Sequence, residues 1–146
     1  MTTKEWNNHQ EKEAAMFQAK DIMTENAISI RKDTAIYEAV ELMVEHDISG
    51  MPVVKNDMTL VGILSEKDVV TLFPIREDDE NKTVSDFMTE PALFFEENES
   101  LEDVCNFLAR NIFRRVPITS KGKVVGVISI RDVLKHTLGL KHEASS

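Results

Sequence analysis

The sequence is poor in the residues that build disulfide-rich, metal-binding and fibrous proteins. Its 146 residues include one cysteine, one tryptophan, five glycines and four prolines. The single cysteine, Cys105, has no internal disulfide partner and no companions at zinc-ligand spacing, so a reducing compartment suits the chain. The four histidines are scattered without metal-ligand spacing and are expected at surface positions near helix ends. The sequence therefore predicts no metal site.

Long apolar runs and an excess of positive charge are also lacking. No apolar run approaches membrane-spanning length, and the first twenty residues are polar and mixed in charge, unlike a secretory leader. Seventeen Lys and Arg against 26 Asp and Glu give a formal net charge of −9, which repels a phosphate backbone. We therefore expect a cytoplasmic protein with no nucleic-acid or membrane partner, folded as one compact domain.

What the sequence does contain is an internal repeat. Shifting the chain by 65 residues aligns the segment DIMTENAISI with DFMTEPALFF. The same shift aligns two apolar stripes with the helical spacing i, i+3, i+4, i+7, i+8, one beginning at Ile36 and the other at Leu101. After the loss of one residue in a turn, GILSEKD from Gly62 aligns with GVISIRD from Gly126. A duplication constrains a fold strongly, so we expect two copies of one structural unit.

Each copy is predicted to contain a short strand, a helix, two strands and a second helix, in the order βαββα. In the first copy these are a strand near 27–30, a helix at 34–46, strands at 51–54 and 60–64, and a helix from Ser65. Turn residues between the two later strands predict a hairpin in both copies. The expected fold class is α+β, with the two units packed into one compact module.

The segments around the two units differ from them in composition. The first unit is expected at 19–73 and the second at 84–139, separated by an acidic linker at 74–83 that follows a proline. Residues 1–18 place a tryptophan among helix formers and predict an N-terminal helix that docks on the module. Residues 140–146 carry no pattern and are expected to form a flexible tail.

The motif Ser-x-x-Asp stands at the second strand-to-helix junction of each copy, as Ser65 with Asp68 and Ser129 with Asp132. The N–H groups at a helix N-terminus can dock an anion, a serine can donate to phosphate, and an aspartate can accept from both hydroxyls of a ribose. The structural alternative is that each serine caps its helix and each aspartate favours the helix dipole. Capping alone does not explain why a glycine precedes the motif and a valine follows it in both copies.

Two adjacent arginines, Arg114 and Arg115, directly precede a strand of the second copy. Guanidinium groups suit phosphate because their donors form a rigid, permanently charged fork. The alternative is a surface ion pair with carboxylates of the linker. Ser49 and Gly50 occupy the equivalent positions in the first copy, so anion preference is expected to differ between the copies. Cys105 lies on an apolar helical stripe and is expected to be a core thiol, and no catalytic constellation can be assembled.

These features together resemble a tandem pair of CBS motifs, the Bateman module. Each copy opens with Asp-x-Met-Thr and ends in Gly-x-x-Ser-x-x-Asp, and the resemblance spans about 20–139. It implies that the units pack sheet against sheet with pseudo-twofold symmetry. It also implies two clefts that bind AMP, ADP, ATP, S-adenosylmethionine or related compounds, each formed by the opening segment and proline strand of one copy and the Ser-x-x-Asp of the other. No cofactor is required for this role.

The resemblance assigns residues to both clefts. The first cleft would combine Ser65, Lys67, Asp68, Thr89, Leu93, Arg114, Arg115, Val116 and Pro117. In it, Asp68 would hold the ribose, Leu93 and Val116 would flank the adenine, and the serine and the cations would face phosphates. The second cleft would combine Thr24, Ile28, Ser49, Gly50, Met51, Pro52, Ser129, Arg131 and Asp132. It has less positive charge, so we expect it to be emptier or to prefer a less phosphorylated ligand.

The function implied by this resemblance is regulation without catalysis. An occupied cleft would shift the angle between the two motifs and so change the activity of a separate target protein, with the module itself expected to be a homodimer. The alternative is a ligand-independent interaction or structural module whose clefts are vestigial. Binding of adenosyl compounds separates these two hypotheses.

Overall fold

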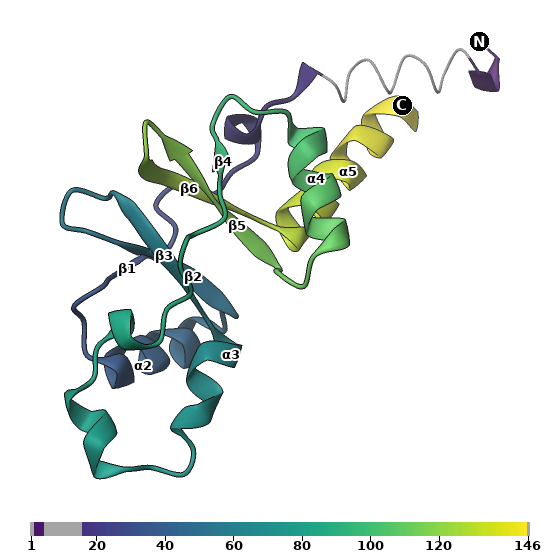
Figure 1. Cartoon of the computed structure of the whole chain (residues 1–146). Coiled ribbons are helices and arrows are strands. Elements are labelled where there is room, and N and C mark those ends of the chain that lie inside the picture. Colours follow the sequence, from purple (N-terminus) through teal and green to yellow (C-terminus); the bar gives the residue numbers. More distant parts are fainter. Residues whose placement is uncertain (1, 5–15, 146) are drawn as a thin grey trace.

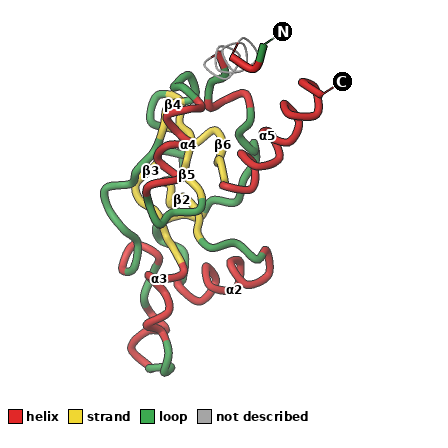
Figure 2. Tube along the Cα trace, turned by 90° about the vertical axis from the view of Figure 1, so that its right-hand side faces the viewer, coloured by secondary structure: helices red, strands yellow, loops and turns green. Residues whose placement is uncertain are grey.

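Figure 1 shows a computed structural model of the chain, which describes residues 2–4 and 16–145. Two three-stranded sheets meet at the centre, and the helices of the two copies lie on either side of them (Figure 1, Figure 2). The α+β class with two βαββα repeats is therefore confirmed. Trp6, Ala14 and Ala15, which predicted the N-terminal helix, lie outside the described residues.

The first copy follows the predicted order of elements. It comprises η1 (Ala19–Asp21), β1 (Ile30–Arg31), α2 (Ile36–His46), β2 (Gly50–Val54), β3 (Leu60–Ser65), α3 (Glu66–Val69) and η2 (Val70–Leu72). In its sheet, β1 pairs with β2 in parallel and β2 pairs with β3 antiparallel. The apolar stripe of α2 is buried through Ile36, Ala39 and Met43, as its helical spacing predicts.

The second copy repeats this arrangement with a longer final helix. It comprises η4 (Val84–Asp86), β4 (Phe95–Glu96), α4 (Leu101–Arg110), β5 (Arg115–Ser120), β6 (Lys123–Ser129) and α5 (Ile130–Ser145). Its sheet has β4 parallel to β5 and β5 antiparallel to β6. Residues 140–145, where the sequence pattern suggested a flexible tail, continue α5, because no proline interrupts them and a single glycine costs a helix only about 1 kcal/mol.

The segment between the copies is held by its own contacts. Within the range predicted to be a solvated acidic linker, the chain forms η3 (Glu77–Asn81) and buries Asp79 to 4% exposure. The carboxylate of Asp79 lies 3.0 Å from the Lys82 ammonium and 3.8 Å from the Arg76 guanidinium. A buried carboxylate needs such partners, so this acidic segment has a packing role in addition to its surface charge.

Two crossed backbone bridges join the opening segments to the opposite copies, and a third bridge between the copies pairs Thr59 with Lys123. Ile63 of β3 exchanges backbone hydrogen bonds with Thr89, at 3.1 and 2.8 Å. Thr24 makes the same exchange with Val127 of β6, at 2.8 and 3.1 Å. Each copy therefore places its opening segment beside the third strand of the other copy. This arrangement brings residues about 25 to 100 positions apart into one region between the sheets.

Candidate functional site

The crossed bridges bring the threonine of each opening segment to the aspartate of the opposite copy. The hydroxyl of Thr89 donates to Oδ1 of Asp68 at 3.2 Å. The hydroxyl of Thr24 lies 3.4 and 3.5 Å from the two carboxylate oxygens of Asp132. The opening segment of each copy thus meets the Ser-x-x-Asp of the other, as the resemblance implies. The residues before each proline do not cross in this way, because Gly50 pairs with Ser65 and Arg115 pairs with Ser129 of their own copies.

Both serines cap their helices, as the structural alternative proposed. The backbone N–H of Ser65 donates to Oδ2 of Asp68 at 2.8 Å, and its hydroxyl donates to the same oxygen at 3.0 Å. In the second copy, the N–H of Ser129 donates to Oδ2 of Asp132 at 2.9 Å. In Asp68, Oδ2 is thus committed to the cap while Oδ1 accepts from Thr89. In Asp132, the threonine hydroxyl lies near both oxygens, including the capping Oδ2.

The helix N-termini themselves offer few free donors. The first N–H of α3, on Glu66, already donates to the carbonyl of Ser49 at 2.9 Å, and the N–H of Ile130 donates to Arg114 at 2.9 Å. Moreover, α3 is only four residues long, so its dipole is small. Side-chain cations must therefore provide most of the attraction for an anion at this site.

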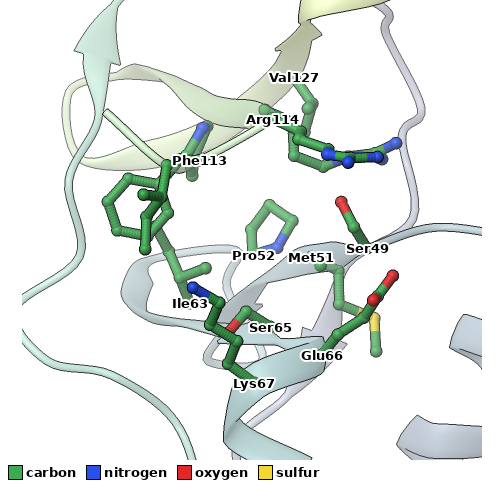
Figure 3. Close-up of a pocket in the computed structure, with 14 residues that line it drawn as sticks. Ser49, Met51, Pro52, Ile63, Ser65, Glu66, Lys67, Phe113, Arg114 and Val127 are labelled. Atoms are coloured by element: carbon green, nitrogen blue, oxygen red, sulfur yellow. The ribbon is translucent and has the colours of Figure 1, made fainter. Parts of the chain in front are cut away.

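A cavity of about 360 Å³ lies between the two copies, within the range of about 300–1,000 Å³ typical of small-molecule sites. Figure 3 shows Arg114 and Val127 entering it from the second copy, opposite Ser65, Glu66 and Lys67 of the first. The residues that line it are Ser49, Gly50, Met51, Pro52, Ile63, Ser65, Glu66, Lys67, Ile112, Phe113, Arg114, Arg115, Pro117 and Val127. The cavity therefore joins the loops that precede β2 and β5 with the start of α3.

The cavity includes some of the predicted site residues and leaves others outside its lining. Its lining includes five of the residues predicted for the first cleft. It also includes four of those predicted for the second cleft, namely residues 49–52. Asp68 is hydrogen-bonded to Ser65, which lines the cavity, and Thr89 is hydrogen-bonded to Asp68. Val116 is 1% exposed in the core, and Leu93 is 44% exposed. Their roles beside adenine remain predictions.

The remaining predicted residues belong to the second cleft. Thr24 and Asp132 contact each other, and Ser129 is joined to Asp132 by the cap. Ile28 packs against the core of the first copy. Arg131 is exposed on the first turn of α5. None of these five residues lines the cavity.

Five lining residues were missed by the sequence reasoning: Ile63, Glu66, Ile112, Phe113 and Val127. Ile63 and Val127 occupy equivalent positions, each directly before a residue whose side chain is fully buried in its own copy. Successive side chains of a strand point to opposite faces of the sheet, so Ile63 and Val127 face away from their own copy's core and toward the other sheet. This alternation in the sequence could have identified them. Ile112 and Phe113 belong to a loop without periodicity, so only the packed structure shows where they lie.

The charges around the cavity are mostly positive. Lys67, Arg114 and Arg115 line it together with one carboxylate, Glu66. Burial lowers the pKa of the Arg115 guanidinium, and the charge of Asp132 acts in the opposite direction. Among the described residues, the buried Nε of Arg115 has no hydrogen-bond partner. A buried donor without an acceptor is costly, so this guanidinium has unused hydrogen-bonding capacity beside the cavity.

Cys105 has the environment of a structural thiol. Burial raises the pKa of the Cys105 thiol, and the charge of Glu102 raises it further. A raised pKa lowers the thiolate fraction at neutral pH, and thiolate is the reactive form. We expect iodoacetamide at pH 7.5 to alkylate Cys105 several-fold more slowly than it alkylates cysteine in an unfolded chain. Equal rates in native protein and in urea, followed by mass spectrometry, would contradict this assignment.

The part of the chain that the structure describes contains neither a cluster of metal-ligating side chains nor a membrane-spanning helix. Across residues 2–4 and 16–145, no three His, Cys, Asp or Glu side chains gather closely enough to hold a metal ion. No helix within the same residues combines the length and apolar character needed to cross a bilayer.

Comparisons with known proteins agree with this geometry. The family model for the CBS domain matches residues 19–75 and 84–139. The uncharacterized protein MJ1225 of Methanocaldococcus jannaschii is 33% identical over 116 residues, covering 80% of this chain and 41% of that protein. Inosine-5'-monophosphate dehydrogenase of the same organism is 31% identical over 122 residues, covering 83% of this chain and 24% of the enzyme. The chain thus spans less than half the length of these relatives.

Solved structures show the same architecture. The crystal structure of CBSX2 in complex with AMP superimposes with a TM-score of 0.76 at 30% sequence identity. The match covers 86% of this chain and 98% of that one. A protein of the same name is known from Arabidopsis thaliana.

Proposed function

This chain belongs to the CBS domain family, and from that premise we propose that it is a regulatory module that binds an adenine nucleotide between its two CBS units. The observation that carries the proposal is the cavity shared by the two copies, with two arginines and a lysine in its wall. The AMP complex of CBSX2, which has the same fold at 30% identity, supports an adenosyl ligand. The module itself would catalyse nothing and would require no cofactor.

The charge of the cavity favours a phosphorylated ligand. Three cations against one carboxylate give this region a positive balance within a chain of net charge −9. An anionic nucleotide such as AMP, ADP or ATP would offer oxygen acceptors to the guanidinium groups of Arg114 and Arg115. S-adenosylmethionine carries a positive sulfonium and no phosphate, so we propose that it binds more weakly than the nucleotides.

The position of the cavity suggests how binding would be transmitted. Because its walls come from both copies, a bound nucleotide would contact both units and favour one angle between them. A target protein that contacts both units would respond to that angle.

The exposed apolar residues Ile130, Leu134 and Leu138 recur every four residues along α5, and we propose that a second copy or the target covers them.

Thermal unfolding with a panel of ligands tests this function. AMP, ADP and ATP at 100 times their dissociation constants are expected to stabilise the chain by about 2.7 kcal/mol, whereas S-adenosylmethionine at the same concentrations gives a smaller shift. The midpoint of unfolding, followed by circular dichroism or dye fluorescence, measures the effect. Guanosine nucleotides serve as the control for non-specific phosphate binding. No shift with any adenosyl compound would favour the ligand-independent interaction module.

A further inference from the structure

The segment that follows α3 holds three apolar side chains in solvent. Figure 1 and Figure 2 show this segment projecting at the lower end of the molecule. Val70, Phe73 and Ile75 are 69%, 84% and 78% exposed, and we call these three residues the linker tip. Large apolar side chains exposed together often mark a surface that contacts another protein.

Contacts on both sides of the linker tip hold it in this position. Before Phe73, Leu72 is 7% exposed and belongs to the core of the first copy. After Ile75, the Arg76 guanidinium donates back to the carbonyl of Thr71 at 3.1 Å, which closes the loop. The loop is therefore anchored to the body of the first copy while its apolar side chains point away from the core.

The last helix carries a second exposed apolar surface, at the opposite end of the molecule (Figure 1). Ile130, Leu134 and Leu138 are 40%, 57% and 56% exposed, and their spacing places them along one face of α5. We call these three residues the α5 stripe. The shift that aligns the two Ser-x-x-Asp motifs also aligns Val70 with Leu134. Both copies therefore expose an apolar side chain at the same position of the repeat.

The charged residues beside these two surfaces have opposite signs. Arg131 and Lys135 each follow a residue of the α5 stripe and are exposed. Three exposed carboxylates follow the linker tip, on Glu77, Asp78 and Glu80. Within the described part of the chain, none of these five side chains forms an ion pair. The linker tip is thus an apolar surface with an acidic border, and the α5 stripe is one with a basic border.

We infer that two copies of this chain associate in an antiparallel dimer, in which the linker tip of each chain packs on the α5 stripe of the other. Twofold symmetry would form this contact twice. A second copy fits because it supplies both an apolar surface and the opposite charge, whereas a parallel dimer would place acidic border against acidic border. The two surfaces lie at opposite ends of one chain, so they cannot cover each other within it (Figure 1). The inference does not depend on nucleotide binding.

Sedimentation of the nucleotide-free full chain tests this contact. We expect a dimer at about 10 µM, and a chain that is still monomeric at about 100 µM would overturn the inference while leaving nucleotide binding intact. Phe73→Ser and Leu134→Ser are each expected to raise the dissociation constant of the dimer about 100-fold, because each removes apolar burial from both symmetric contacts.

Both substitutions replace exposed side chains, and circular dichroism checks that the variants fold. Met58→Asn is the matched control, since Met58 is 39% exposed in the turn between β2 and β3, outside both surfaces. Its backbone has φ of 73°, a conformation that asparagine tolerates. The control should dimerise as the wild type does. A folded Phe73→Ser protein with the dissociation constant of the wild type would overturn the inference.

Charge reversal distinguishes the antiparallel dimer from a parallel one. Glu77→Lys combined with Asp78→Lys would place positive charge against the basic border of the α5 stripe, and we expect the dissociation constant to rise about tenfold. Adding Lys135→Glu to this double variant should recover most of the lost affinity. In a parallel dimer, reversal at both linker tips leaves like charges facing each other, so the double variant would bind as the wild type does. That result, or a triple variant no tighter than the double variant, would overturn the antiparallel arrangement.

Discussion

Asp68→Ala is expected to weaken binding of the preferred nucleotide by about 10- to 100-fold. A carboxylate that accepts from ribose hydroxyls contributes about 1.5–3 kcal/mol, and each 1.4 kcal/mol is a factor of ten in affinity. Oδ2 of Asp68 is occupied by the Ser65 cap, whereas Oδ1 accepts, from the described residues, the Thr89 hydroxyl at 3.2 Å. A ribose would take over or share that exposed bond. Isothermal titration of the variant and the wild type measures the change in dissociation constant.

Asp132→Ala is the matched control for this prediction. Asp132 closes an equivalent cap, since the N–H of Ser129 donates to it at 2.9 Å. Both variants should therefore lose similar stability, about 1 kcal/mol for a lost cap. Affinity should fall far more in Asp68→Ala, because only the first copy's motif adjoins the cavity. Equal losses of affinity in the two variants would contradict the asymmetry between the clefts.

The repeat made most of the fold predictable from sequence. The stripes that begin at Ile36 and Leu101 both lie on helices, and the bounds of the first helix differ from the predicted 34–46 by two residues. Such stripes follow from burial of one helical face, which depends on local spacing alone. The first strand of each copy was harder to place, because β1 and β4 contain two residues each and are specified by pairing with β2 and β5.

The second helix of each copy shows where local patterns become insufficient. The duplicated motif predicts a helix after Ser65 and after Ser129, and both form. The first ends after four residues and the second continues for 16. The first is followed by a 3-10 turn and then by Pro74, which restricts the residue before it and ends helices, whereas nothing comparable follows Ser129. Pro74 therefore explains why the helical stretch does not continue past residue 73, while the repeat itself predicts equal helices and does not account for the end of α3 at Val69.

The contact between each opening segment and the opposite Ser-x-x-Asp was predictable from the sequence, whereas the walls of the cavity were not. The resemblance predicted that Thr89 would meet Asp68 across the copies, and the structure places them in contact. The resemblance did not predict that Phe113 and Glu66 line the cavity. The lining depends on how the two sheets pack against each other, and the residues of the two sheets are far apart in the sequence. The sequence comparison of Gly50 with Arg115 identified a difference in charge. The strand register adds that these two residues pair with the serines of the two motifs, Ser65 and Ser129.

The glycine that precedes each motif has an explanation that sequence alone left open. A Cβ on Gly126 would lie 2.7 Å from Sδ of Met23 and 3.0 Å from the carbonyl oxygen of Thr24. Gly62 has equivalent neighbours in Met88 and Thr89, the closest at 2.8 Å. The opening segment of the opposite copy, rather than a ligand, therefore makes the close approach. Glycine is required in both copies because the crossed bridges bring backbone against backbone there.

Gly126→Val is accordingly expected to destabilise the chain by about 3 kcal/mol, lowering the midpoint of thermal unfolding by about 10 °C. The Met23 side chain can move aside, but the Thr24 carbonyl is fixed by its 3.1 Å hydrogen bond from Val127, so the bridge must open. Gly139→Val is the matched control, since nothing lies within 4 Å of its Cβ position in α5 and valine is at least as good a helix former as glycine. Its midpoint should stay within about 2 °C of the wild type. Similar losses in the two variants would show that the crossed bridge does not hold the copies together.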